Sequence, residues 1–219
     1  MSPIGAIFDW DGVVIDSSAA HETSWERLAQ EQRRLLPPGH FKAGFGRKSE
    51  YIVQHVLGWT RDPEEARMLS RRKEELYREV LRERGIEPLP GVREFLARLR
   101  AAAIPCAIGS STERKNIDTI LALIGWERLF PAIVSADDVS IGKPNPQVFL
   151  LAAQKIGLPA ARCVVFEDAL VGLEAARAGG MKSVGVATTH PPQALVGADL
   201  VVRRLDEIGT EDLARLFEA

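Results

Sequence analysis

The sequence predicts an α/β fold, in which helices cover both faces of a parallel β-sheet and a block of helices is inserted after the first strand. Two observations carry this prediction. From residue 88 onward, short apolar runs of strand length alternate with helical patterns, an order typical of a parallel sheet buried on both faces. Residues 18–85 show only helical patterns, and they form a segment far longer than an ordinary connection.

The expected strands are the apolar runs at residues 4–10, 104–110, 132–136, 162–168, 182–188 and 200–205. The helical patterns between the later strands cover residues 91–102, 114–125, 145–157 and 169–180. In a parallel sheet of this kind, the ligand crevice lies outside the carboxyl ends of the strands. The polar residues that follow the strands are therefore the first candidates for function.

The inserted block is expected to fold as a small helical domain. Helical patterns cover residues 20–36, 48–58 and 63–85, and proline and glycine interrupt the chain at 36–40 and 87–92. We therefore predict a core domain of residues 1–16 and 88–219 and a helical cap domain of residues 17–87.

Composition excludes several classes of function. The 219 residues carry a net charge of −2 and are 46% hydrophobic, which is ordinary for a globular protein and lacks the basic excess of a nucleic-acid binder. No apolar run is long enough to span a membrane, and no signal-peptide pattern begins the chain. Cys106 and Cys163 lie inside apolar runs and are expected to be buried, reduced thiols. These features predict a cytoplasmic protein.

Polar side chains follow four of the expected strands. They are Asp9 and Asp11 after the first, Ser110, Ser111 and Thr112 after the second, Lys143 after the third, and Glu167 and Asp168 at the end of the fourth. Clustered carboxylates repel one another unless a cation lies among them. Oxygen ligands without Cys or His favour Mg²⁺, so Mg²⁺ is the expected cofactor.

The same residues suit the transfer of a phosphoryl group. Lys143 and the Ser110 hydroxyl fit a phosphate, Asp9 could attack phosphorus, and Asp11 could move the proton. Each residue taken alone also fits an ordinary role, because an Asp at a strand end can turn the chain or cap a helix. Their combination in this order favours an active site.

Four segments, "DWDGVVID", "IGSST", "GKPNP" and "VVFEDALVGLEAARAGG", resemble the four motifs of the haloacid dehalogenase superfamily. The resemblance runs from residue 4 to about residue 190 and implies a Rossmann-like core. It implies that Asp9 is the nucleophile, that Asp11 is the general acid and base, and that Ser110 and Lys143 hold the phosphoryl group. Mg²⁺ would be held by the Asp9 carboxylate, the Asp11 carbonyl and Asp168, with Glu167 as a direct or water-mediated partner. Dehalogenases of the family lack the second aspartate, so Asp11 favours phosphoryl transfer.

The helical insertion resembles the cap of members that include beta-phosphoglucomutase and many sugar-phosphate phosphatases. By this resemblance His21, Arg47 and Lys73 would bind substrate, together with Ser111 and Thr112. The alternative is that Lys73 lies on the solvated face of a charged helix. After Ser110 the chain reads "SSTERKN", which is longer than the corresponding turn of the mutase and is closer to related phosphatases.

We therefore expect a Mg²⁺-dependent phosphatase that acts on a small sugar phosphate or a related phosphomonoester through an aspartyl-phosphate on Asp9. The first alternative is an isomerase similar to beta-phosphoglucomutase that interconverts beta-glucose 1-phosphate and glucose 6-phosphate. The second alternative is a non-catalytic protein that binds a phosphorylated metabolite. The expected partner is a small phosphorylated metabolite, with neither nucleic acid nor membrane, and the expected state is a monomer or weak homodimer.

Overall fold

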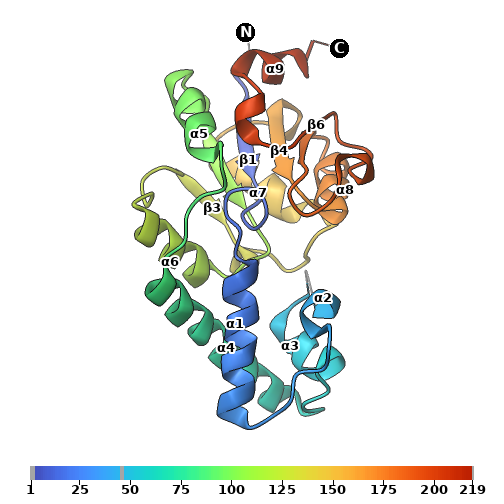
Figure 1. Ribbon diagram of the computed structural model, residues 1–219. Coiled ribbons are helices and arrows are strands. Elements are labelled where there is room, and N and C mark those ends of the chain that lie inside the picture. Colours follow the sequence, from blue (N-terminus) through green and yellow to red (C-terminus); the bar gives the residue numbers. More distant parts are fainter. Residues whose placement is uncertain (1–2, 45–46, 219) are drawn as a thin grey trace. The chain divides into compact units, whose positions relative to one another are not determined.

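The computed structural model describes residues 3–44 and 47–218 (Figure 1). The chain divides into two compact units. Residues 1–16 and 87–219 form one of them, called here the sheet unit, and residues 17–86 form the other, called the helical unit.

The sheet unit is built on six parallel strands in the order β3-β2-β1-β4-β5-β6. The strands are β1 (Gly5–Phe8), β2 (Cys106–Gly109), β3 (Ala132–Val134), β4 (Cys163–Glu167), β5 (Lys182–Val186) and β6 (Leu200–Val202). From β1 the chain first builds outward through β2 and β3, and then returns to add β4, β5 and β6 on the other side. This confirms the predicted α/β fold, with the change of direction between β1 and β4.

Helices follow most strands of this unit. They are α5 (Val92–Ala101), α6 (Arg114–Ile124), α7 (Gln147–Lys155), α8 (Leu170–Ala178) and α9 (Thr210–Arg215), with short 3-10 turns at η2 (Ala136–Asp138), η3 (Ala160–Arg162), η4 (Pro192–Ala194) and η5 (Leu205–Glu207). The expected helices of the core match α5 to α8 closely.

Neighbouring side chains of β1 point to opposite faces of the sheet, as strand geometry requires. Phe8 stacks on Phe166 at a centroid distance of 4.6 Å and meets Phe95 of α5 edge-on. Ile7 lies in the other core, with Val165 and the buried faces of α7 and α8. Every residue of β1 to β4 is buried, which explains their continuous apolar runs.

The helical unit contains α1 (Ser18–Gln32), α2 (His40–Gly44), α3 (Ser49–Tyr51) with the π-helical turn η1 (Ile52–Val56), and α4 (Pro63–Arg84). No strand occurs among the described residues of this unit. Helix α1 ends earlier than residue 36 because Arg33 adopts a left-handed conformation. Helix α4 begins where expected, since Asp62 accepts a hydrogen bond from the Glu64 amide and Pro63 occupies the first turn.

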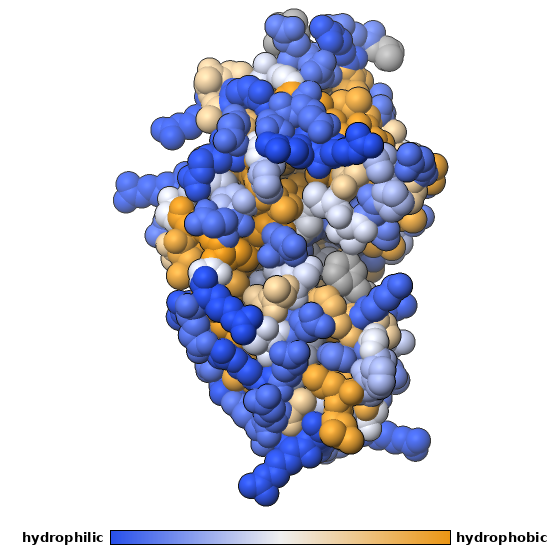
Figure 2. Space-filling view, in the orientation of Figure 1, coloured by the Kyte–Doolittle hydropathy of each residue, from blue (hydrophilic) through white to orange (hydrophobic). Residues whose placement is uncertain are grey.

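The core of the helical unit lies between its helices, where Trp25, Leu28, Val53 and Leu69 are buried together. Hydrophilic side chains cover much of the outer face of α1 and α4 that Figure 2 shows. Among the residues that the structure describes, no helix combines the length and the apolar character that crossing a membrane requires.

Both cysteines are free and buried in the sheet unit, as the sequence predicted. Burial raises the pKa of the Cys106 thiol to about 12 and that of Cys163 to about 11. Because only the thiolate is a good nucleophile, we assign neither cysteine a chemical role.

Candidate active site

Three acidic side chains meet where β1 and β4 end. Asp9 follows β1 directly, and its amide donates to the Phe166 carbonyl of β4 at 2.9 Å. Glu167 is the last residue of β4, and Asp168 is the next. Because the two strands are neighbours, Asp9, Glu167 and Asp168 each place a carboxylate oxygen within 4.8 Å of the others, and all three residues are buried.

Lys143 lies among these carboxylates. Its Nζ is 2.8 Å from Oδ1 of Asp9 and 3.1 Å from Oε2 of Glu167, and its side chain is only 6% exposed. Burial alone would lower the pKa of Lys143, but the two carboxylates outweigh burial and raise it above its usual range. The lysine is therefore a permanent positive charge within the site.

One cation does not compensate three buried carboxylates. Burial, followed by the charge of Asp9, raises the pKa of Glu167 well above its usual range. The same two causes raise the pKa of Asp168 to about 7. A divalent cation with oxygen ligands would relieve this repulsion, so the donor set fits Mg²⁺.

Ser110 and Asp11 lie at the same edge of the sheet. Ser110 follows β2, its amide donates to the Val134 carbonyl, and its buried Oγ accepts from the Thr112 amide at 3.1 Å. The Thr112 hydroxyl donates to Oδ2 of Asp11 at 2.5 Å. Ser111, between Ser110 and Thr112 in the chain, is exposed. Thr112 is predicted to bind substrate, and in this structure its hydroxyl holds the Asp11 carboxylate.

A loop without a predicted role in function completes the site. After β5, the Thr189 hydroxyl donates to Oδ2 of Asp168, and the Thr188 hydroxyl donates to the Gly12 carbonyl. Gly12 has a φ of +78°, and a Cβ at this position would collide with the Asp168 carboxylate. The two threonines carry the same signal as the predicted residues, because they are polar side chains that follow a strand of a parallel sheet.

Gly172, in the first turn of α8, is another residue that the sequence pattern did not reveal. A Cβ at this position would overlap the Glu167 carboxylate. The glycine therefore leaves the space that the buried acid occupies.

His21 and Lys73 meet inside the helical unit. Nζ of Lys73 is 2.6 Å from Nδ1 of His21 and 2.9 Å from Oε1 of Glu74, which also accepts from the Ser49 hydroxyl at 2.7 Å. The ring of Tyr77 stacks on His21 at 3.9 Å. Burial and then the charge of Lys73 lower the pKa of His21 to about 3. Lys73 is thus buried and does not belong to a solvated face.

Arg47, the third substrate residue expected in this unit, is exposed. Its guanidinium lies 5.2 Å from the centre of the Tyr51 ring. Tyr51 in turn contacts the His55 ring at a centroid distance of 4.5 Å. The structure therefore brings His21 and Lys73 together and holds Arg47 on an aromatic surface.

Two curated relatives are named as phosphatases. The chloroplastic 5-amino-6-(5-phospho-D-ribitylamino)uracil phosphatase of Arabidopsis thaliana is 39% identical over 218 residues, which cover 98% of this chain and 58% of the relative. The chain thus spans little more than half the length of that relative. Fructose-1-phosphate phosphatase YqaB of Escherichia coli strain K12 is 34% identical over 182 residues, which cover 83% of this chain and 95% of the relative.

Other similarities cover most of the chain or nearly all of it. Beta-phosphoglucomutase of Bacillus subtilis strain 168 is 30% identical over 218 residues, covering 97% of this chain and 94% of the relative. The solved structure of a HAD hydrolase, family IA, variant 3, from Entamoeba histolytica HM-1:IMSS has a TM-score of 0.88 at 27% identity, and covers 99% of this chain and 100% of that chain. The sequence model described as haloacid dehalogenase-like hydrolase matches residues 5–180. The predicted family is confirmed: the chain belongs to the haloacid dehalogenase-like hydrolases.

Proposed function

We propose that this protein is a Mg²⁺-dependent phosphatase that hydrolyses small sugar phosphates or related phosphomonoesters through an aspartyl-phosphate on Asp9. The observation that carries the proposal is the position of the Lys143 ammonium, 2.8 Å from the Asp9 carboxylate within a buried acidic cluster. A carboxylate nucleophile needs such compensation, because it must approach a phosphate that is itself negatively charged.

In the first half of the reaction, a carboxylate oxygen of Asp9 attacks phosphorus and the bond to the ester oxygen breaks. Asp11 donates the proton that the leaving oxygen takes up. In the second half, Asp11 accepts a proton from water, whose oxygen attacks phosphorus and releases orthophosphate from Asp9. Lys143 stabilises the negative charge of the transferring group, and the Ser110 hydroxyl donates a hydrogen bond to it.

The bound metal would neutralise charge on the phosphate and orient it for attack. The metal would be held by the Asp9 carboxylate, the Asp11 carbonyl and Asp168, with Glu167 as a direct or water-mediated partner. The Thr112 hydroxyl, which donates to Asp11, would hold the acid and base in place between the two half-reactions.

The names of the relatives support the substrate class. The A. thaliana and E. coli relatives are phosphatases whose named substrates carry phosphate on a ribityl group or on fructose. We extend this class to the present chain, as phosphate esters of sugars or sugar alcohols. The helical unit would act as the cap over the site, with His21, Lys73 and Arg47 contacting the rest of the substrate.

Beta-phosphoglucomutase activity is the second candidate, because the B. subtilis mutase is similar along nearly its whole length. A mutase must bind a bisphosphate through either of its phosphates. In this chain the turn after Ser110 continues into α6, where Arg114 pairs with Asp118 at 2.8 Å. This turn is longer than the corresponding turn of the mutase and closer to that of related phosphatases, which favours the phosphatase.

A panel of phosphate esters tests the proposal through release of orthophosphate. The panel includes fructose 1-phosphate, 5-amino-6-(5-phospho-D-ribitylamino)uracil, and beta-glucose 1-phosphate with a trace of its bisphosphate. We expect release that requires Mg²⁺, is stopped by EDTA and is abolished by Asp9→Asn. Formation of glucose 6-phosphate without orthophosphate would instead show the mutase. Turnover that survives Asp9→Asn would refute the assignment of the nucleophile.

A further inference from the structure

The loop that carries Lys143 lies mostly on the surface. It connects η2 to α7, and Ser140, Ile141, Gly142 and Pro144 are all exposed. Lys143 is the residue of this loop that reaches inward, to Asp9 and Glu167. Val139, at the start of the loop, packs against the hydrophobic core. The exposed residues that follow it bury little apolar surface, so hydrogen bonds contribute more to the position of Lys143.

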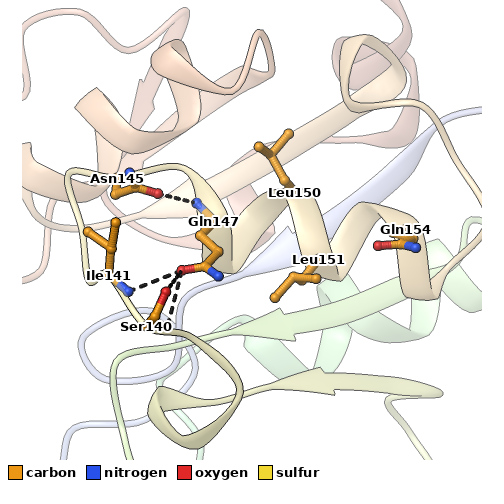
Figure 3. Close-up of a pocket in the computed structure, with 7 residues that line it drawn as sticks. All are labelled: Ser140, Ile141, Asn145, Gln147, Leu150, Leu151 and Gln154. Atoms are coloured by element: carbon orange, nitrogen blue, oxygen red, sulfur yellow. Dashed lines mark hydrogen bonds between the residues drawn. The ribbon is translucent and has the colours of Figure 1, made fainter.

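Gln147, the first residue of α7, supplies three of these hydrogen bonds. Its Oε1 accepts from the Ser140 amide at 3.1 Å, from the Ile141 amide at 3.1 Å and from the Ser140 hydroxyl at 3.2 Å (Figure 3). The convergence of three donors on one atom assigns that atom as the amide oxygen. The side chain thus ties the incoming half of the loop to the start of the helix.

The outgoing half is fixed at the same place. The Asn145 amide donates to the Gly142 carbonyl at 3.1 Å, which closes a turn with Lys143 and Pro144 at its centre. The Asn145 side chain accepts from the Gln147 amide at 3.0 Å, and Figure 3 shows the two side chains at the start of α7. Gln147 is therefore hydrogen-bonded to both halves of the loop.

The lysine side chain rests on the same helix. Its Nζ is 4.8 Å from the centre of the Phe149 ring, two residues beyond Gln147. Helix α7 thus positions both the backbone of Lys143, through Gln147, and its ammonium group, through Phe149. A loop that moves relative to this helix would move Nζ relative to Asp9.

We infer that Gln147 is a positioning residue for Lys143. This inference rests on the proposed phosphatase, in which the lysine stabilises charge on the transferring group. Gln147 acts through the loop backbone, and its amide oxygen keeps the ammonium at the distance that both carboxylates require. The proposed role requires a hydrogen-bond acceptor at position 147, which a carboxylate oxygen would supply and a thioether would not.

The experiment compares Gln147→Met, which removes the acceptor at similar volume, with Gln147→Glu, which keeps it. Gln154→Met is the matched control, since Gln154 lies on the same helix and lines the same surface pocket (Figure 3). We expect Gln147→Met to lower kcat about tenfold or more, because small misplacements of catalytic groups are costly. The inhibition constant of inorganic phosphate should rise as well. Gln147→Glu should stay within about threefold of wild type, and Gln154→Met should be unchanged.

A purely structural role would lower Tm and leave kcat of the folded protein intact. The inference is therefore overturned if Gln147→Met matches the wild-type kcat at a temperature where both are folded, or if Gln147→Glu is as slow as Gln147→Met. Wild type and Asp9→Asn are measured in the same assay. When wild type is active and Asp9→Asn is not, the proposed function stands whatever the Gln147 variants do. An inactive wild type would overturn the proposed function and this inference together.

Discussion

The negative charge of Asp168 should cost the protein stability when no divalent cation is bound. Asp168 is only 4% exposed, and burial together with the charge of Asp9 raises its pKa from 3.8 to about 7. An acid whose pKa is higher in the folded state keeps its proton longer there than in the unfolded chain. The folded state therefore loses stability as pH rises from 3.8 through 7. Asp168→Asn keeps the shape of the side chain and removes this loss.

The size of the effect follows from the pKa shift. An increase of the pKa from 3.8 to about 7 corresponds to about 4 kcal/mol once the carboxyl is fully ionised, at pH 8 or above. Relaxation around the ionised group and penetration of water reduce such values. We therefore expect Asp168→Asn to stabilise the metal-free protein by about 2 kcal/mol at pH 8. For a chain of this length that corresponds to an increase in Tm of about 4–8 °C.

Thermal unfolding at pH 8 and pH 5, in EDTA and in excess Mg²⁺, measures this. In EDTA at pH 8 the Asp168→Asn variant should melt higher than wild type, and at pH 5 the difference should shrink because the wild-type acid is protonated. Mg²⁺ should raise the Tm of wild type and not that of the variant. Asp118→Asn, at an exposed acid of α6, is the control and should change Tm by about 1 °C or less. A variant that melts lower than wild type in EDTA at pH 8 would refute the repulsion argument.

Three further predictions follow from other contacts. Thr189→Val removes the hydroxyl that donates to Asp168, so the Mg²⁺ dissociation constant measured by calorimetry should rise about tenfold, and Thr189→Ser should restore it. Gly172→Ala puts a Cβ against Glu167 and should destabilise the fold by about 1–3 kcal/mol in urea denaturation; an unchanged midpoint would contradict this packing. The pKa of His21 is lowered to about 3, so the unfolded chain takes up a proton at this residue before the folded protein does. The folded state should therefore lose stability as pH falls below 6.5. Between pH 7 and pH 4.5, the Tm of His21→Gln should fall less than that of wild type.

The acidic cluster could be predicted from the sequence because parallel strands end at one edge of a sheet. Asp9 and Asp168 are 159 positions apart, yet both follow an apolar run of strand length. The strand order was not visible in that pattern, and it is the adjacency of β1 and β4 that brings the carboxylates within 4.8 Å. The pattern thus identified the residues, whereas the distances between their carboxylates depend on which strands pair.

Three of the missed residues, Thr188, Thr189 and Gln147, act through hydrogen bonds across loops. Gln147 begins a helix, and nothing in the helical pattern shows that its side chain turns back to Ser140. Lys73 is a different case: the family resemblance assigned it to substrate binding, the charge pattern of its helix allowed a solvated face, and the structure buries it. His21 and Glu74 compensate the burial of the Lys73 ammonium, and His21 comes from another helix, α1. A single-helix pattern has no access to such a partner.

Charge compensation also orders the events at the site. Asp9, Glu167 and Asp168 bring three carboxylates, and Lys143 brings one ammonium, so the fully ionised cluster is negative and repels a phosphate dianion. Without a divalent cation the cluster reduces this repulsion by protonation, as the raised pKa of Glu167 shows. A divalent cation cancels the excess charge and leaves the ammonium free to attract the phosphate. Affinity for inorganic phosphate should therefore depend steeply on Mg²⁺, because compensation of the carboxylates must come before the nucleophile can meet its substrate.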